Sequence, residues 1–286
     1  MTDKTVIGKK ISPVVIVFLG LLAAIAPLST DMYLPALPSM TDNFNVSSSM
    51  VQLTLTGSLV GMAVGQLFAG PLSDIFGRKP PLIASMLIFS LATAGCFLSD
   101  SIYPFLCFRL LQGFFGGAGI VIARAVVRDI ASGPELMKLF SMLMLVNGLA
   151  PVAAPVIGGQ ILRFFSWRGV FALLFIIAVG LTVGSLIFKE TLKTTGKGGL
   201  KKSLIMYRIL MRNTYFMGHC IMQCFAFAAF LLILPDLLFF FKTCTTCRHK
   251  RIVTFSVLTV SACGLPGFSS VVWRAMRRIG KFYGVR

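Results

Sequence analysis

Charged residues, and acidic ones above all, are scarce in this sequence. Asp and Glu number 9 in 286 residues while Lys and Arg number 27, so that only 13% of the chain is charged. A soluble protein with a net charge of +18 would be a candidate for nucleic-acid binding. Here the basic residues collect in short segments between long uncharged runs, which is the distribution that membrane proteins show. We therefore expect a lipid bilayer, and no nucleic acid, among the partners of this chain.

Sequence signatures of catalysis and of metal binding are missing as well. A Walker A sequence, an HExxH motif, a dinucleotide fingerprint and a Ser-His-Asp set are all absent, which argues against an enzyme. Cys244 and Cys247 have a metal-like spacing and His249 lies nearby, but a zinc site usually needs a second spaced pair in a folded domain. We expect no cofactor and no metal site.

Apolar residues are abundant, at 56% of the chain with a mean hydropathy of +0.88. About 20 helical residues are needed to cross the hydrocarbon core of a bilayer. Six runs of that order predict an all-α polytopic membrane protein with helices at about 11–30, 51–72, 81–98, 102–123, 139–162 and 169–188. After the first run, Pro35 and Pro38 argue against a continued regular helix.

Four parts follow from these runs and from the charges between them. Residues 1–188 would form an N-terminal six-helix bundle, 189–212 a basic cytoplasmic linker with Glu190 as its single acid, 213–241 a seventh transmembrane helix, and 242–286 an atypical basic tail. Lys9 and Lys10 place the N-terminus in the cytoplasm, since basic residues favour that side. Arg163 and Arg168 would then lie in an external turn, a mild violation of the rule. A frameshifted or otherwise disrupted product would explain the tail, with a divergent natural terminus as the alternative.

Arg109 is the sharpest polar signal within the apolar runs. It follows Asp100 by nine residues, which places it roughly 13 Å into the bilayer at the rise of an α-helix. An arginine there is costly and suggests a function, although it could instead snorkel or form a structural pair. Gln112 falls on the same helix face. Asp31, at the external end of the first helix, is the natural acidic partner and could bind protons or organic cations, or be an ordinary acid at a helix end.

The segment GPLSDIFGRKPP at 70–81 links the second and third runs. Asp74 and Arg78 are close enough for a local ion pair around a turn in which Gly77 supplies backbone freedom. Arg128 and Asp129 form a second mixed pair at the next cytoplasmic link. An ordinary interfacial loop is the alternative to a gate. The predicted cytoplasmic gate comprises Gly70, Asp74, Gly77, Arg78, Lys79, Arg128 and Asp129.

Small residues and prolines recur in two of the predicted helices. Gly57, Gly61 and Gly65 in the second run would let a neighbouring helix approach closely. Two prolines in the fifth run should kink it, and the glycines beside them would permit close packing or a pivot. A purely structural kink remains the alternative. The predicted pivot comprises Gly148, Pro151, Pro155, Gly158 and Gly159.

Four segments stand in an order and spacing that are specific when taken together. They are STDMYLPALP at 29–38, GPLSDIFGRKP at 70–80, RLLQGFFGGAG at 109–119 and NGLAPVAAPVIGG at 147–159. They resemble the major facilitator superfamily, and in particular its drug:proton antiporter branch of the bicyclomycin and chloramphenicol resistance type. Ala154 departs from that pattern, which usually has a glycine before the proline. The resemblance covers residues 1 to about 230 and is not seen from Leu231 onward.

The resemblance implies two six-helix bundles around a midplane cavity, of which this chain supplies the first, the linker and the start of a seventh helix. It implies a secondary transporter that exports small amphipathic drugs across the bacterial inner membrane in exchange for protons. Asp31, Arg109 and Gln112 would form the proton- and substrate-binding site. A chain without the second bundle would instead be a non-transporting remnant or a half-transporter. A membrane scaffold whose basic linker binds anionic lipid or a partner is the alternative of another class.

Overall fold

A computed structural model describes residues 13–192, 205, 208–226 and 228 of the chain. The chain divides into two compact units, Met1–Ser203 and Leu204–Arg286. In the second unit the described residues 208–212 and 214–226 are helical, and the latter fall within the predicted seventh helix. Residues 229–241 of that helix, most of the predicted linker and the tail with its proposed disruption lie outside the described residues.

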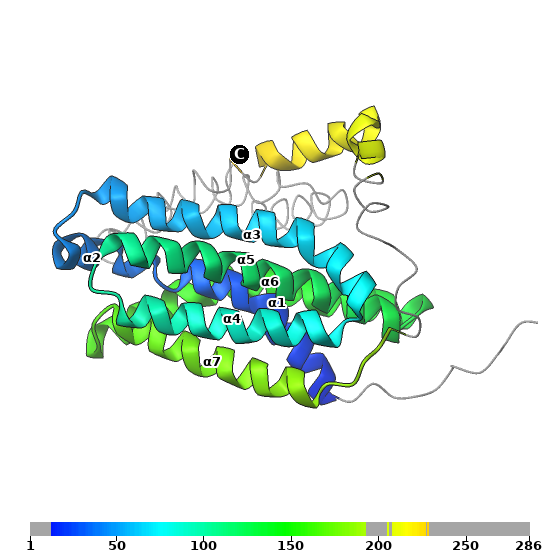
Figure 1. The fold of residues 1–286 in the computed structure, drawn as a ribbon, viewed down its shortest axis with the longest axis horizontal. Helices are drawn as coiled ribbons and strands as arrows, with labels where there is room; N and C mark the ends of the chain where they lie inside the picture. The colour runs from blue at the N-terminus through cyan, green and yellow to red at the C-terminus, as the bar shows by residue number, and fades with distance from the viewer. Residues whose placement is uncertain (1–12, 193–204, 206–207, 227, 229–286) are drawn as a thin grey trace, which may run out of the picture. The chain divides into compact units, whose positions relative to one another are not determined.

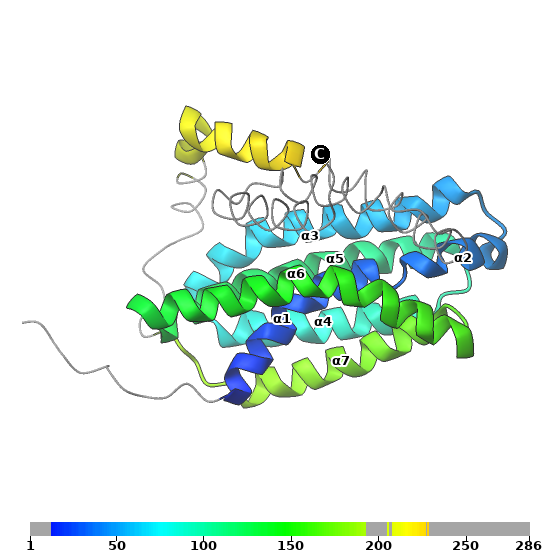
Figure 2. The ribbon, with the colours of Figure 1, turned by 180° about the vertical axis from the view of Figure 1, so that it is seen from behind.

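The described part of the first unit consists of six long helices and two short ones. The long helices are α1 (Pro13–Asp31), α3 (Ser48–Phe76), α4 (Lys79–Leu98), α5 (Ile102–Ile130), α6 (Gly133–Phe164) and α7 (Arg168–Ile187), and the short ones are η1 (Leu34–Ala36) and α2 (Leu37–Phe44). Among the described residues, six segments are long and apolar enough to cross a membrane, the first being Pro13–Phe44. Figures 1 and 2 show the long helices side by side along a common direction, with α2 at the end opposite to the α3–α4 turn. The predicted all-α fold with an N-terminal six-helix bundle is confirmed.

Two stretches expected to be irregular are helical instead. Pro35 and Pro38 end α1 at Asp31, as expected, but they lie in the first turns of η1 and α2, where the missing N–H of a proline loses no hydrogen bond. Only Ala131 and Ser132 separate α5 from α6, although these helices were expected to end at 123 and begin at 139. Arg, Lys and Glu are good helix formers, so both helices continue past their apolar runs.

Glycines bring the backbones of α3 and α5 together. A Cβ built at Gly61 would overlap the carbonyl oxygen of Leu110, and one at Gly65 would overlap a second carbonyl of α5. In return, a Cβ at Gly113 of α5 would overlap the carbonyl oxygen of Ser58. Helices approach this closely only where small residues line the contact. The close approach predicted for the α3 glycines is confirmed, and α5 is the partner helix.

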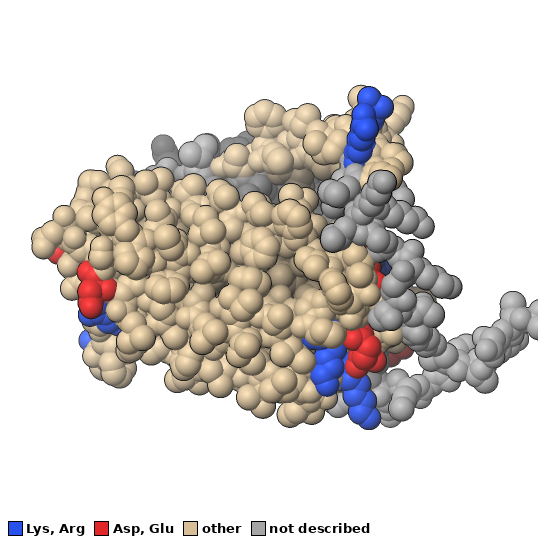
Figure 3. Space-filling view, viewed as in Figure 1, with Lys and Arg blue, Asp and Glu red and all other residues tan. Residues whose placement is uncertain are grey.

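Charged side chains gather at the two ends of this unit. Figure 3 shows them there, with an uncharged surface between the ends on the face in view. At one end Arg168 donates from Nη2 to Asp100 Oδ1 at 2.7 Å, and its Cζ lies 4.9 Å from the centroid of the Trp167 ring. The Asp100 carboxylate therefore compensates the charge of Arg168, one of the two arginines expected in an external turn against the rule that basic residues favour the cytoplasm. With six apolar spans and charges at their ends, the chain is a multi-pass membrane protein.

Candidate functional site

Arg109 lies inside the bundle, and its side chain is fully buried. Its Nη1 donates to the backbone carbonyl of Ser29 at 2.9 Å and to Gln112 Oε1 at 2.6 Å. Gln112 is also fully buried, and its Nε2 donates to Thr93 Oγ1 at 2.8 Å. The expected common face of Arg109 and Gln112 is therefore present, and their hydrogen bonds join α1, α4 and α5.

The guanidinium of Arg109 also lies over aromatic rings. Its Cζ is 4.2 Å from the centroid of the Tyr33 ring and 5.8 Å from that of Phe171 in α7. A desolvated cation–π contact stabilises by about 2 kcal/mol. The Tyr33 hydroxyl lies 3.2 Å from Thr54 Oγ1, so Tyr33 connects Arg109 to α3 as well. Tyr33 was not expected among the site residues. Its signals in the sequence were its place two residues after Asp31 and within the segment STDMYLPALP.

One edge of the Arg109 guanidinium is left unpaired. Its Nε and Nη2 are buried without a hydrogen-bond partner among the described residues. Asp31, the predicted partner, is half-buried at the end of α1 and accepts a hydrogen bond from Thr30 Oγ1 at 3.1 Å. None of the ion pairs between described residues joins it to Arg109. Two adjacent N–H donors of a guanidinium match the geometry of a carboxylate, so this edge has the donor arrangement that an acidic group would need.

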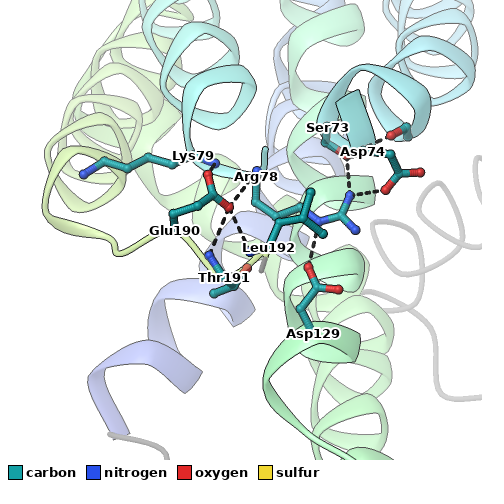
Figure 4. A network of polar contacts seen from close by, with 9 residues as sticks. Ser73, Asp74, Arg78, Lys79, Asp129, Glu190, Thr191 and Leu192 are labelled. Atoms are coloured by element: carbon teal, nitrogen blue, oxygen red, sulfur yellow. Dashed lines mark hydrogen bonds and ion pairs between the residues drawn. The ribbon is translucent and has the colours of Figure 1, made fainter. Parts of the chain in front are cut away.

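A second polar group lies at the α3–α4 turn and is drawn in Figure 4. Arg78 is 4% exposed and donates from Nε to Asp129 Oδ2 at 2.7 Å, and from Nη1 to Ser73 Oγ at 2.8 Å and to Asp74 Oδ1. These four residues are called the Arg78 cluster below. Desolvation lowers the pKa of Arg78, but hydrogen bonds to Asp129 and Asp74, and their charges, outweigh it and raise that pKa. The expected pair of Asp74 and Arg78 is present, and Asp129 ties α5 to it.

Glu190, just past α7, binds the same turn. Its carboxylate accepts hydrogen bonds from the backbone N–H groups of Arg78 and Lys79 at 2.9 Å and of Thr191 and Leu192 at 3.0 Å. Burial would raise the pKa of Glu190, but these donors outweigh it and lower that pKa. Glu190 was not expected in the site. Its isolation among basic residues was the only signal in the sequence.

The other residues of the predicted gate take a smaller part in these contacts. The Lys79 side chain points away from Arg78 in Figure 4, so Lys79 contributes its backbone N–H. Arg128 is exposed, and none of the ion pairs in the described part of the chain includes it. Gly70 has room for a side chain, because a Cβ there would first meet Val121, at 3.8 Å. The gating role of the set stays a prediction.

The predicted pivot helix, α6, is continuous from Gly133 to Phe164 and contains both prolines. Gly158 packs on the chain just after α1, since a Cβ there would overlap the carbonyl oxygen of Met32. A Cβ at Gly148 or Gly159 would have no described atom within 4 Å beyond its own helix. The glycines therefore divide into one that permits close packing and two that lie in open space. The pivot itself stays a prediction.

The bundle and its α3–α4 turn can be compared with known proteins. The sequence model of the family described as Major Facilitator Superfamily matches residues 19–283. The chain belongs to the major facilitator superfamily. A solved member of the superfamily, a proton:xylose symporter, shares the fold with a TM-score of 0.57 at 17% identity, over 72% of this chain and 50% of the symporter. The resemblance seen in the four motifs is confirmed, and the superfamily is one of transporters rather than enzymes.

Two curated relatives each match more than two thirds of this chain. An uncharacterized MFS-type transporter, YdgK, of Bacillus subtilis is 41% identical over 208 residues, which are 71% of this chain and 52% of YdgK. A bicyclomycin resistance protein homolog of Haemophilus influenzae is 37% identical over 217 residues, 74% of this chain and 54% of the relative. The chain therefore spans about half the length of these relatives.

Proposed function

We propose that this chain forms the proton- and drug-binding half of a proton-coupled drug exporter of the bacterial inner membrane. The observation that carries the proposal is the buried Arg109. Its Nε and Nη2 have no hydrogen-bond partner among the described residues, although an acid, Asp31, ends the neighbouring helix α1. An intramembrane cation with free donors is costly and by default indicates a functional site. The Haemophilus relative, named a bicyclomycin resistance protein homolog, supports a drug as the substrate.

In this mechanism Asp31 holds the exchangeable proton and Arg109 adjusts its affinity. A nearby cation favours the ionised carboxylate, while burial favours the protonated one. A cationic drug and a proton would compete for the same carboxylate. Drug export is then coupled to proton entry, because a ligand shifts the equilibrium between two conformational states only when it binds them with different affinity. Gln112 keeps the guanidinium in place through its 2.6 Å hydrogen bond.

The Arg78 cluster would serve as the cytoplasmic gate of this exporter. Its charge-assisted hydrogen bonds join α3, the α3–α4 turn and α5 at one end of the bundle. We assign that end to the cytoplasm, and with it the N-terminus, as Lys9 and Lys10 favour. Opening would require these bonds to break, and α6 would bend at its prolines as the pivot.

Drug accumulation in cells that express the chain, with and without a proton uncoupler, tests the proposal. The wild-type chain should lower accumulation only while the proton gradient persists. Asp31→Asn and Arg109→Ala should abolish that effect. Asp42→Asn is the matched control and should retain it, because Asp42 is an acid of α2 that takes part in none of the ion pairs between described residues. If the wild-type chain lowers accumulation no more than Asp31→Asn does, the proposal fails.

A further inference from the structure

Glu190 occupies a cradle of backbone N–H groups at the start of α4 (Figure 4). Arg78 is the N-cap of α4 and Lys79 its first residue, and both donate to the Glu190 carboxylate at 2.9 Å. The first N–H groups of a helix have no partner within the helix, and the helix dipole favours a negative charge beside them. The backbone N–H groups of Thr191 and Leu192, which directly follow Glu190 in the chain, also donate to its carboxylate.

Gly77 shows how closely the carboxylate approaches the turn. Its φ of +91° lies in a region that side chains disfavour. A Cβ built on Gly77 would also lie 2.7 Å from Glu190 Oε2. The turn therefore requires glycine for two separate reasons, and the second exists only because Glu190 is seated there.

The N–H that Glu190 binds belongs to the residue whose guanidinium reaches Asp74 and Asp129. Because Glu190 fixes the backbone of Arg78, it also limits the positions that the Arg78 guanidinium can reach. We propose that Glu190 is a positioning residue of the Arg78 cluster, anchoring the α3–α4 turn to the end of α7 so that Arg78 reaches both carboxylates. This assignment depends on the proposed transport function only for the gating role of the cluster.

Glu190 and Asp129 bind different parts of Arg78, the backbone N–H and the side-chain Nε. A plain helix cap would stabilise α4 whether or not Asp129 is present. A positioning residue acts through Arg78, so that removing Glu190 also weakens the contact to Asp129. Residues that share a partner in this way have non-additive effects on stability.

The first experiment measures unfolding temperatures of the purified full chain in detergent for Glu190→Gln, Asp129→Asn and the double variant. We expect the double variant to unfold little below the worse of the two single variants. The matched control pairs Glu190→Gln with Asp100→Asn, whose partner Arg168 starts α7. Those two losses should add. If the losses in unfolding temperature of Glu190→Gln and Asp129→Asn also add in their double variant, the proposal is overturned.

The second experiment follows amide hydrogen exchange in the same protein. Glu190→Gln should speed exchange at Arg78 and Lys79 by about tenfold or more, because local opening becomes easier. Glu135→Gln, an exposed acid in the first turn of α6, should leave both amides unchanged. Unchanged exchange in Glu190→Gln contradicts the anchor. If that variant does not fold, the shorter Glu190→Asp replaces it, with the same expectation. Neither experiment needs transport, so failure here is distinguishable from failure of the export proposal.

Discussion

Replacing Gly61 with alanine should force α3 away from α5. The new Cβ would overlap the carbonyl oxygen of Leu110 and lie 3.0 Å from the backbone nitrogen of Phe114. Both are backbone atoms, so no side-chain rotation relieves the overlap, and the helices must separate by on the order of 1 Å. Such overpacking costs about 1–3 kcal/mol. Since 1 kcal/mol corresponds to about 2–4 °C for a domain of this size, the unfolding temperature should fall by about 2–12 °C.

Thermal unfolding in detergent, followed by circular dichroism, measures this loss. Gly148→Ala is the matched control, because a Cβ there would have no described atom within 4 Å beyond its own helix. Alanine in a helix is favoured over glycine by roughly 0.5–1 kcal/mol, so the control should be neutral or slightly more stable. If Gly61→Ala unfolds at the same temperature as Gly148→Ala, the reasoning about a backbone contact between α3 and α5 is refuted.

Three further outcomes follow from the polar contacts. Because hydrogen bonds lower the pKa of Glu190 from its ordinary 4.5, its stabilisation is complete above that pH and is lost as the pH falls through the lower folded value. The unfolding-temperature difference between the wild-type chain and Glu190→Gln should therefore be constant from neutral pH to about pH 5 and close below pH 4.5; a difference that persists at lower pH would contradict this. Tyr33→Phe should lower the free energy of unfolding by about 1 kcal/mol, because the hydroxyl contact is lost. Tyr33→Leu should lower it by about 2 kcal/mol more, because Arg109 also loses the aromatic ring. Equal losses for the two variants in denaturant unfolding would argue against the cation–π contact. Arg78→Lys should destabilise by about 1–3 kcal/mol, since one ammonium cannot replace a planar fork that binds two carboxylates, and an unchanged unfolding temperature would show that the fork is not needed.

Helix ends were harder to predict than helices. The apolar run of α5 stops near 123, but the helix continues to Ile130, because the charged residues that follow are tolerated in a helix outside the bilayer. Pro35 was expected to interrupt regular structure, yet it starts η1. A proline can end one helix and begin another, and the sequence pattern does not distinguish these outcomes.

In the candidate site, contacts within one helix could be predicted from the sequence, whereas contacts between helices could not. Arg109 and Gln112 could be predicted to act together, because residues three apart share a helix face. Their contacts to Ser29 and Tyr33 could not be predicted, since these depend on how α1 packs against α5. The packing of α1 against α5 also decides whether Asp31 meets Arg109. The expected ion pair between these two described residues is absent, although Arg109 bonds to Ser29, which lies two residues before Asp31.

The number of membrane spans is a local property, because each crossing needs its own apolar stretch and the charges must lie at the ends. The sequence by itself therefore determined the six-helix architecture and marked Arg109 as an exception within it. Which helix faces meet is not local. Only the tertiary structure placed Gly61 against Leu110 and brought Glu190 to the α3–α4 turn. Periodicity states which residues share a face, whereas the choice of partner depends on packing among all the helices together.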